Sequence, residues 1–113
     1  MILAGDVGGT KTILALYEIR NGTAVEIKKQ QFASSQCRHF VELLSLFLSV
    51  TEIEAITQVC IGVAGPIEQG DCVATNLPWH IKRDSISAAL KLDAKQVKLL
   101  NDLEACKVQR RTL

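Results

Sequence analysis

A glycine-rich octapeptide near the start of the chain limits its fold more than any other feature. Residues 5–12 read GDVGGTKT and nearly match the P-loop pattern, but Thr10 stands where that pattern has its second glycine. A P-loop leads directly into a helix, whereas residues 13–19 here are strand formers and are followed by Asn21-Gly22, a dipeptide favoured in tight hairpins. The sequence therefore predicts a strand, a glycine turn and a second strand that continues into a hairpin.

The periodicity of the apolar residues changes after this hairpin. Residues 23–32 alternate as a third, solvated strand, and the apolar residues from Phe40 to Leu48 recur at helical spacing, with Ser34 or Ser35 as the cap of that helix. The later elements are predicted as a central strand at 58–64, a hairpin at 67–74, a helix at 85–92 capped by Asp84, and a strand at 97–100. Hairpins mixed with helical crossovers predict one α/β domain of the ribonuclease-H-like kind, with a mixed β-sheet, three leading antiparallel strands and flanking helices.

Composition and charge argue against several classes of function. The formal net charge is +1, from 13 Lys and Arg against 12 Asp and Glu, and aromatic residues make up 4% of the chain. Nucleic acid or an anionic membrane would need a clustered basic face or stacking platforms, so neither partner is expected. Residues 40–50, the longest apolar stretch, are too few and too interrupted to span a bilayer, and the N-terminus lacks a signal-peptide pattern. A cytoplasmic protein with free thiols is therefore expected.

The glycine turn has a chemical interpretation of its own. Consecutive small residues bring backbone N–H groups close to whatever lies beyond the turn, and phosphate is the natural ligand for them. Asp6, at the end of the first strand, would then orient Mg²⁺ directly or through water. An ordinary Gly-Gly hairpin, with Asp6 capping amides, is the alternative that the octapeptide leaves open.

Two further segments carry polar groups that suit a sugar. Asn101-Asp102 follows a strand, at the edge of the sheet where open α/β sheets bind ligands, and the carboxylate there can accept a proton from a hydroxyl. Asp102 can equally be the N-cap of a following helix. Thr75 and Asn76 stand close to Trp79, which suits sugar binding, although a proline-terminated loop with Trp79 in the core is the alternative.

Four segments occur in one order along the chain: residues 3–12 (LAGDVGGTKT), 60–66 (CIGVAGP), 74–79 (ATNLPW) and 100–105 (LNDLEA). Together they resemble the N-terminal domain of the bacterial ATP-dependent glucokinases, which belong to the superfamily of sugar kinases, actin and heat-shock-chaperone ATPases. The resemblance reaches to about residue 105 and implies the actin-like ATPase version of the ribonuclease-H-like fold.

The resemblance also implies a role for each group. The implied reaction transfers the γ-phosphoryl group of ATP to the 6-hydroxyl of D-glucose, with ATP and Mg²⁺ as cofactors. Asp102 would be the general base on that hydroxyl, while Asn101, Asn76 and Thr75 would bind the sugar. The phosphate-binding loop would consist of Gly5, Asp6, Val7, Gly8, Gly9 and Thr10, with Asp6 near the metal.

The family continues into a larger second domain that this sequence does not contain. Residues 1–105 are expected to form the N-terminal domain and 106–113 an atypical polar and basic tail, as in a truncated or frame-shifted product or a domain fragment. Because such kinases close two domains over their substrates, the chain alone is expected to bind weakly and to turn over little. A non-catalytic sugar-binding or regulatory relative stays open, as do a ribonuclease-H-like nuclease that uses Asp6 and Glu42, and a homodimer.

Overall fold

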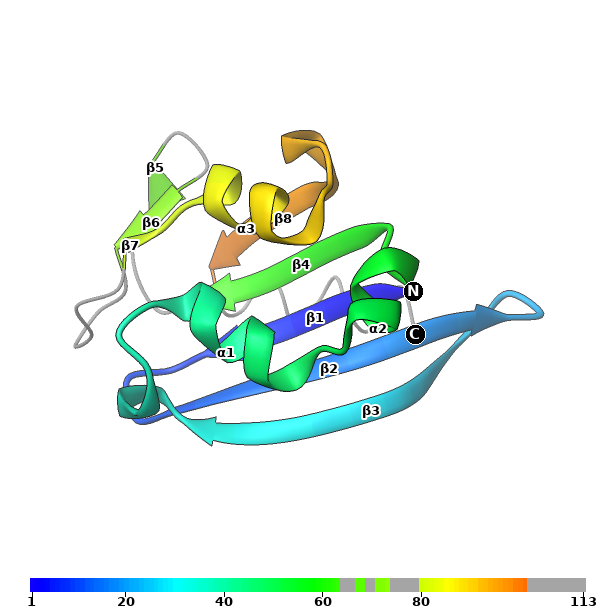
Figure 1. Ribbon diagram of the computed structural model, residues 1–113, viewed down its shortest axis with the longest axis horizontal. Coiled ribbons are helices and arrows are strands. Elements are labelled where there is room, and N and C mark those ends of the chain that lie inside the picture. Colours follow the sequence, from blue (N-terminus) through cyan, green and yellow to red (C-terminus); the bar gives the residue numbers. More distant parts are fainter. Residues whose placement is uncertain (64–66, 69–70, 74–79, 102–113) are drawn as a thin grey trace.

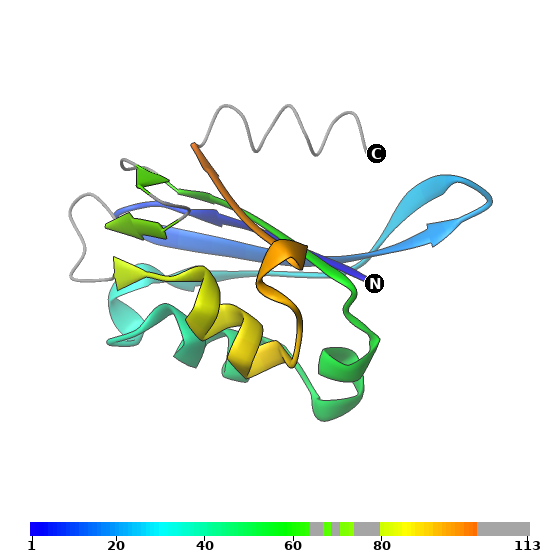
Figure 2. The same ribbon diagram turned by 90° about the horizontal axis from the view of Figure 1, so that it is seen from above.

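The computed structural model of the chain describes residues 1–63, 67–68, 71–73 and 80–101 (Figure 1). Within them, a five-stranded sheet carries all of its helices on one face, as the view from above shows (Figure 2). The elements follow in the order β1 (Ile2–Val7), β2 (Lys11–Arg20), β3 (Thr23–Ala33), the 3-10 helix η1 (Ser34–Gln36), α1 (Phe40–Phe47), α2 (Val50–Ala55), β4 (Gln58–Val63), β5 (Ile67–Glu68), β6 (Asp71–Val73), β7 (His80–Ile81), α3 (Arg83–Leu90), the 3-10 helix η2 (Ala94–Gln96) and β8 (Val97–Asn101).

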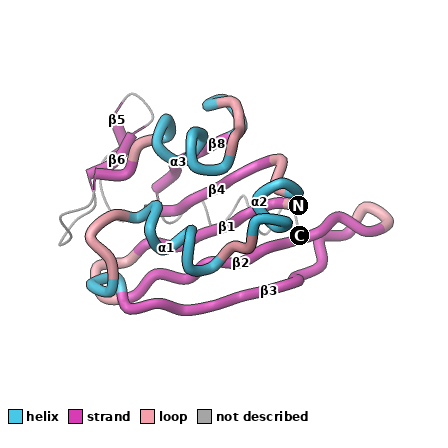
Figure 3. The backbone as a smooth tube through the Cα atoms, viewed as in Figure 1, coloured by secondary structure: helices cyan, strands magenta, loops and turns pink. Residues whose placement is uncertain are grey.

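The main sheet is mixed, as predicted. Its strand order is β3-β2-β1-β4-β8, in which β1, β2 and β3 pair antiparallel while β4 is parallel to both β1 and β8 (Figure 3). A second, three-stranded sheet has the order β5-β6-β7 and contains the hairpin expected at 67–74. No helix in the described part of the chain is long and apolar enough to cross a membrane.

The Asn-Gly hairpin is confirmed by its backbone angles. Asn21 has φ 52° and Gly22 has φ 78°, so both central residues of the turn have the positive φ that its sequence favours. The strands that it joins, β2 and β3, are longer than the predicted 13–19 and 23–32. As expected for a solvated edge, Lys29 and Gln30 on β3 are exposed.

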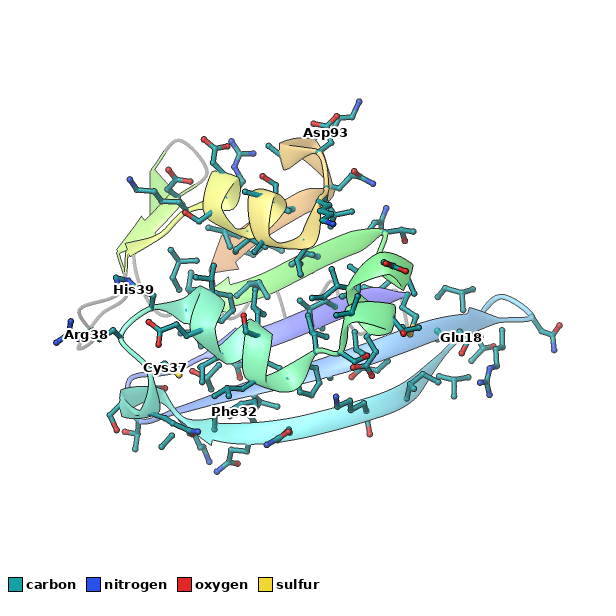
Figure 4. All side chains as sticks on the ribbon, viewed as in Figure 1. Glu18, Phe32, Cys37, Arg38, His39 and Asp93 are labelled. Atoms are coloured by element: carbon teal, nitrogen blue, oxygen red, sulfur yellow. The ribbon has the colours of Figure 1, made fainter. Side chains whose placement is uncertain are left out.

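The core lies between the sheet and the helices. Alternate residues of β1, β2 and β4 face it, and the predicted apolar stripe of α1 packs against them. Phe32 at the end of β3 lies beneath α1, where its ring meets Phe47 edge to face at a centroid distance of 6.3 Å (Figure 4). The fully buried side chains that build this core are Leu3, Val7, Leu14, Leu16, Leu43, Leu44, Phe47, Ile61, Val63, Ile81 and Ile86.

Both predicted helix caps are wrong. Ser34 and Ser35 belong to η1, and the N-cap of α1 is His39, which makes no side-chain capping bond. The third helix begins at Arg83 rather than Ser85, so Asp84 lies inside its first turn and does not cap it. A residue from β6 takes over that function, since the Oδ1 of Asp71 accepts a hydrogen bond of 3.0 Å from the Arg83 N–H.

The short helix α2 was not predicted, although its start has a sequence signature. Ser49 and Glu52 form a capping box, in which the Ser49 hydroxyl accepts from the Glu52 N–H at 3.2 Å and Glu52 accepts from the Ser49 N–H at 2.8 Å. Lys28 of β3 joins this junction. Its ammonium group lies 3.1 Å from the Glu52 carboxylate, donates to the Phe47 carbonyl at the end of α1, and stands 4.7 Å from the centre of the Phe47 ring.

We expect Asp71→Ala to lower the free energy of unfolding by about 1 kcal/mol, because the first N–H of α3 then loses its acceptor. Asp84→Ala is the matched control, since it removes an acidic side chain from the same helix end without removing a capping bond, and should cost about 0.3 kcal/mol. Urea unfolding of the two variants beside the wild type measures both values. Equal losses would contradict the assignment of the cap to Asp71.

The Ser49 N–H and then Lys28 lower the pKa of Glu52 below its ordinary value of 4.5, although burial opposes them. A carboxyl whose folded pKa is lowered stabilises the protein fully above its unfolded pKa, and this contribution is lost as the pH falls through the folded pKa. Glu52→Gln keeps the shape and removes the charge. The free energy of unfolding should therefore decrease less between pH 7 and pH 3.5 in this variant than in the wild type. An equal decrease in both proteins would show that Glu52 does not carry the effect.

Candidate functional site

Three parallel strands end at one edge of the main sheet. Val7 of β1 is the register partner of Val63 in β4, and Val63 is the partner of Asn101 in β8. The glycine turn, defined here as residues 8–10, follows β1 directly. Two strand spacings separate Val7, the last residue of β1, from Asn101, which is a distance of about 10 Å. The fold thus brings the glycine turn and the end of β8 to the same carboxyl edge, where open α/β sheets bind ligands.

The glycine turn is tight at its base and open at its tip. The Gly8 N–H donates to the Lys11 carbonyl at 3.0 Å, and a Cβ added at Gly8 would lie 3.0 Å from that same oxygen. A side chain at this position would press on the backbone that closes the turn. Gly9 and Thr10 are exposed, so the tip of the turn is accessible to a ligand.

Two fully buried hydroxyl groups lie beneath the turn. Thr12 of β2 and Ser34 of η1 are 0% exposed, and their side-chain oxygens are 2.9 Å apart. The Ser34 hydroxyl also donates to the Gly8 carbonyl at 2.7 Å, and the Ser34 N–H donates to the Thr10 carbonyl at 2.9 Å. Sequence analysis missed this role of Ser34 because a serine shortly before a helix has the signature of a cap.

Asp6 faces away from the helices. It alternates with the buried Val7 on β1, is exposed, and lines a shallow pocket of about 140 Å³ together with Tyr17 and Lys29. Burial and then the charge of Glu26 raise the pKa of Tyr17, so its phenol stays protonated and can donate into this pocket. An exposed carboxylate next to a turn of amides fits a hydrated Mg²⁺, which needs only one or two carboxylates when phosphate supplies the other oxygens.

Gly5 and Val7 stand in the motif for reasons of packing. A Cβ at Gly5 would lie 2.8 Å from the Cδ1 of Ile61 and 3.0 Å from the Cδ2 of Leu14, so the ends of these two core side chains would have to shift to admit one. The Val7 side chain is 1% exposed and belongs to the core. Their predicted place in the phosphate-binding loop therefore concerns the backbone alone and stays a prediction.

Several predicted site residues lie outside the described residues. These are Asp102, Thr75 and Asn76, together with the neighbouring Trp79. Asn101 is the last described residue, and the end of its strand is where the prediction expects it. The nuclease alternative needs Asp6 and Glu42 at one metal site, but Glu42 is exposed on α1 while Asp6 faces the side of the sheet opposite the helices. The described residues also hold no group of three or more His, Cys, Asp or Glu able to bind a metal.

The fold is similar to that of solved sugar kinases, which have the actin-like ATPase fold. The glucokinase from an Antarctic psychrotroph superposes with a TM-score of 0.76 at 28% identity, over 90% of this chain and 32% of that one. A putative sugar kinase from Cytophaga hutchinsonii shares the fold, with a TM-score of 0.67 at 20% identity, over 90% of this chain and 36% of that one.

The family model for glucokinase matches residues 3–111, and the chain belongs to the glucokinase family. The glucokinase of Synechocystis sp. is 33% identical over 113 residues, which are 91% of this chain and 31% of that protein. That of Nostoc sp. is 34% identical over 107 residues, which are 93% of this chain and 31% of that protein. This chain thus spans about a third of the length of these relatives.

We expect Thr12→Val to lower the free energy of unfolding by about 1 kcal/mol, because a methyl group of nearly the same size replaces the hydroxyl bonded to Ser34. Thr12→Ser keeps the hydroxyl and loses only a methyl group. Thermal and urea unfolding of both variants separate the hydrogen bond from the packing. If Thr12→Val were as stable as the wild type, the buried bond would contribute nothing to the turn.

Proposed function

We propose that this chain is the N-terminal portion of a glucokinase, which transfers the γ-phosphoryl group of ATP to the 6-hydroxyl of D-glucose. The observation that carries the proposal is the meeting of the glycine turn and the end of β8 at one carboxyl edge, in a chain whose residues 3–111 match the glucokinase family. The glucokinase of Balamuthia mandrillaris, which shares the fold with a TM-score of 0.65 at 23% identity over 91% of this chain and 30% of its own, was crystallised in complex with glucose.

In this proposal, the first half of the site handles the phosphates. The backbone N–H groups of the glycine turn bind phosphate oxygens, and Asp6 orients Mg²⁺ directly or through water. When bound there, Mg²⁺ would supply positive charge that offsets the charge on the phosphoryl group in a loose transition state. Most of the rate enhancement then comes from positioning and from the field of the fixed amides, which need no rearrangement during the reaction.

The second half of the site handles the sugar. Asp102 accepts the proton of the 6-hydroxyl, and a general base of this kind contributes about 10²–10⁴-fold to the rate. Asn101 donates to and accepts from a neighbouring hydroxyl, since an amide side chain has both functions. Thr75 and Asn76 complete the sugar contacts from the segment before β7. The family resemblance supports these four assignments.

The proposal also assigns this sequence to one part of the enzyme. Residues 1–105 act as the N-terminal domain and 106–113 as an atypical tail. Kinases of this kind close two domains over their substrates, so a chain spanning about a third of its relatives' length should bind weakly by itself. The cytoplasm, where ATP is available, is the proposed location, and a homodimer stays a prediction.

The decisive experiment is a ¹H–¹⁵N NMR titration of the chain with glucose, with galactose as the control. We expect peaks of Asn76, Asn101 and Asp102 to shift with glucose and not with galactose. A dispersed spectrum that responds equally to both sugars, or to neither, would contradict a glucose site in this chain. Equal responses to the two sugars would favour a general sugar-binding relative instead.

A second test uses a chimera in which this chain replaces the matching third of the Synechocystis glucokinase. We expect Asp102→Asn in that chimera to lower kcat by about 10²–10⁴-fold, because the proton acceptor is lost. The dissociation constant for glucose should change less than twofold, since the amide retains the shape of the carboxylate. A chimera whose turnover is insensitive to Asp102→Asn would exclude Asp102 as the base.

A further inference from the structure

Ser34 is bonded to the glycine turn at two points. Its hydroxyl donates to the Gly8 carbonyl at 2.7 Å, and its backbone N–H donates to the Thr10 carbonyl at 2.9 Å. Both bonds cross from η1 to the turn, over 26 and 24 positions of sequence (34 − 8 and 34 − 10). Ser34 itself is completely buried, so water does not compete for these bonds.

Because the peptide bond is planar, these two contacts also determine the directions of two N–H groups, those of Gly9 and Lys11. In a trans peptide the C=O and the following N–H point in opposite directions. Because the Gly8 carbonyl points at Ser34, the Gly9 N–H points away from it. The same argument applies to the Thr10 carbonyl and the Lys11 N–H. Ser34 therefore fixes the orientation of the Gly9 N–H in the glycine turn and of the Lys11 N–H directly after it, and both point away from Ser34.

The proton of Thr12 completes this arrangement. A serine hydroxyl has one proton, and that of Ser34 is used in the bond to Gly8. In the 2.9 Å contact between the two hydroxyls, Thr12 must then be the donor. The result is a directed chain from the Thr12 hydroxyl to the Ser34 hydroxyl to the Gly8 carbonyl. A hydroxyl that accepts one hydrogen bond donates the next more strongly, so Thr12 reinforces the hold on the turn.

We propose that Ser34 is a positioning residue whose hydroxyl holds the Gly9 N–H in the direction needed to bind the phosphates of a nucleotide, while its backbone N–H holds the Lys11 N–H beside it. This inference rests on the proposed function, because it assigns a phosphate ligand to the glycine turn. Two adjacent glycines leave a turn with many accessible conformations, and fixing one of them before binding removes that entropy from the cost of binding.

The test compares Ser34→Ala with Ser87→Ala by NMR titration with Mg·ATP and, separately, with glucose. Ser87 is the matched control, because it is also buried, at 8% exposed, and its hydroxyl also donates to a backbone carbonyl, that of Asp84 at 3.0 Å. We expect Mg·ATP to shift the Gly9 and Lys11 amide peaks of the wild type. Ser34→Ala should raise the dissociation constant for Mg·ATP about tenfold and leave that for glucose unchanged, whereas Ser87→Ala should change neither.

Each outcome decides between the two proposals. A Ser34→Ala variant that binds Mg·ATP within twofold of the wild type overturns the role of Ser34 and leaves the proposed function intact. A wild-type turn whose amide peaks ignore Mg·ATP overturns the phosphate role of the glycine turn and, with it, the role of Ser34, whereas the sugar half of the proposed function is decided by the glucose titration. If Ser34→Ala does not fold, residual dipolar couplings of the wild type give the directions of the Gly9 and Lys11 N–H bonds. Directions averaged by motion, rather than fixed relative to β2, would then overturn the inference.

Discussion

The parallel pairing of β1 with β4 is the constraint on which the rest of the structure depends. β1 lies in the middle of the main sheet, with β2 antiparallel on one side and β4 parallel on the other. Because β8 is parallel to β4, the strands β1, β4 and β8 all end at the same edge of the sheet, at the register partners Val7, Val63 and Asn101. A shift of β1 by one residue would move the glycine turn away from this edge and would expose the core side chains of the strand, since side chains alternate between the two faces.

The glycine-rich motif at residues 5–12 contains residues that meet three different physical requirements. At Gly5, a Cβ would press on the ends of the Ile61 and Leu14 side chains in the core. Gly8 is small because the Lys11 carbonyl closes the turn beside it. Asp6 is the acidic residue of this stretch, and it is exposed on the face opposite the helices. A motif of this kind therefore contains residues required by the fold as well as residues available to a ligand, and the structure is needed to tell which are which.

The sequence predicted the features that depend on neighbouring residues. The Asn21-Gly22 turn follows from local backbone preference, and the stripe on α1 follows from the 3.6-residue period. Helix α2 was missed although its capping box at Ser49 is equally local. The caps of α1 and α3 were predicted wrongly because the actual contacts join residues far apart in the sequence. Asp71 reaches α3 only because β6 pairs with β7, and Ser34 reaches the turn only because β3 pairs with β2, so neither contact has a local signature.

Helix α1 shows how the site and the core are connected. Its first turn has no side-chain cap, and the chain reaches it from η1 through Cys37, Arg38 and His39 (Figure 4). Ser34 in η1 is bonded to the glycine turn, while the last carbonyl of α1, that of Phe47, accepts a hydrogen bond from Lys28 on β3. The helix is thus tied to the sheet through the segment before its start and through its last residue, Phe47, whose buried ring also packs against Phe32 of β3. In the proposed role of Ser34, the position of the glycine turn depends on this arrangement, because Ser34 can hold the turn only as firmly as the core holds the segment that carries Ser34.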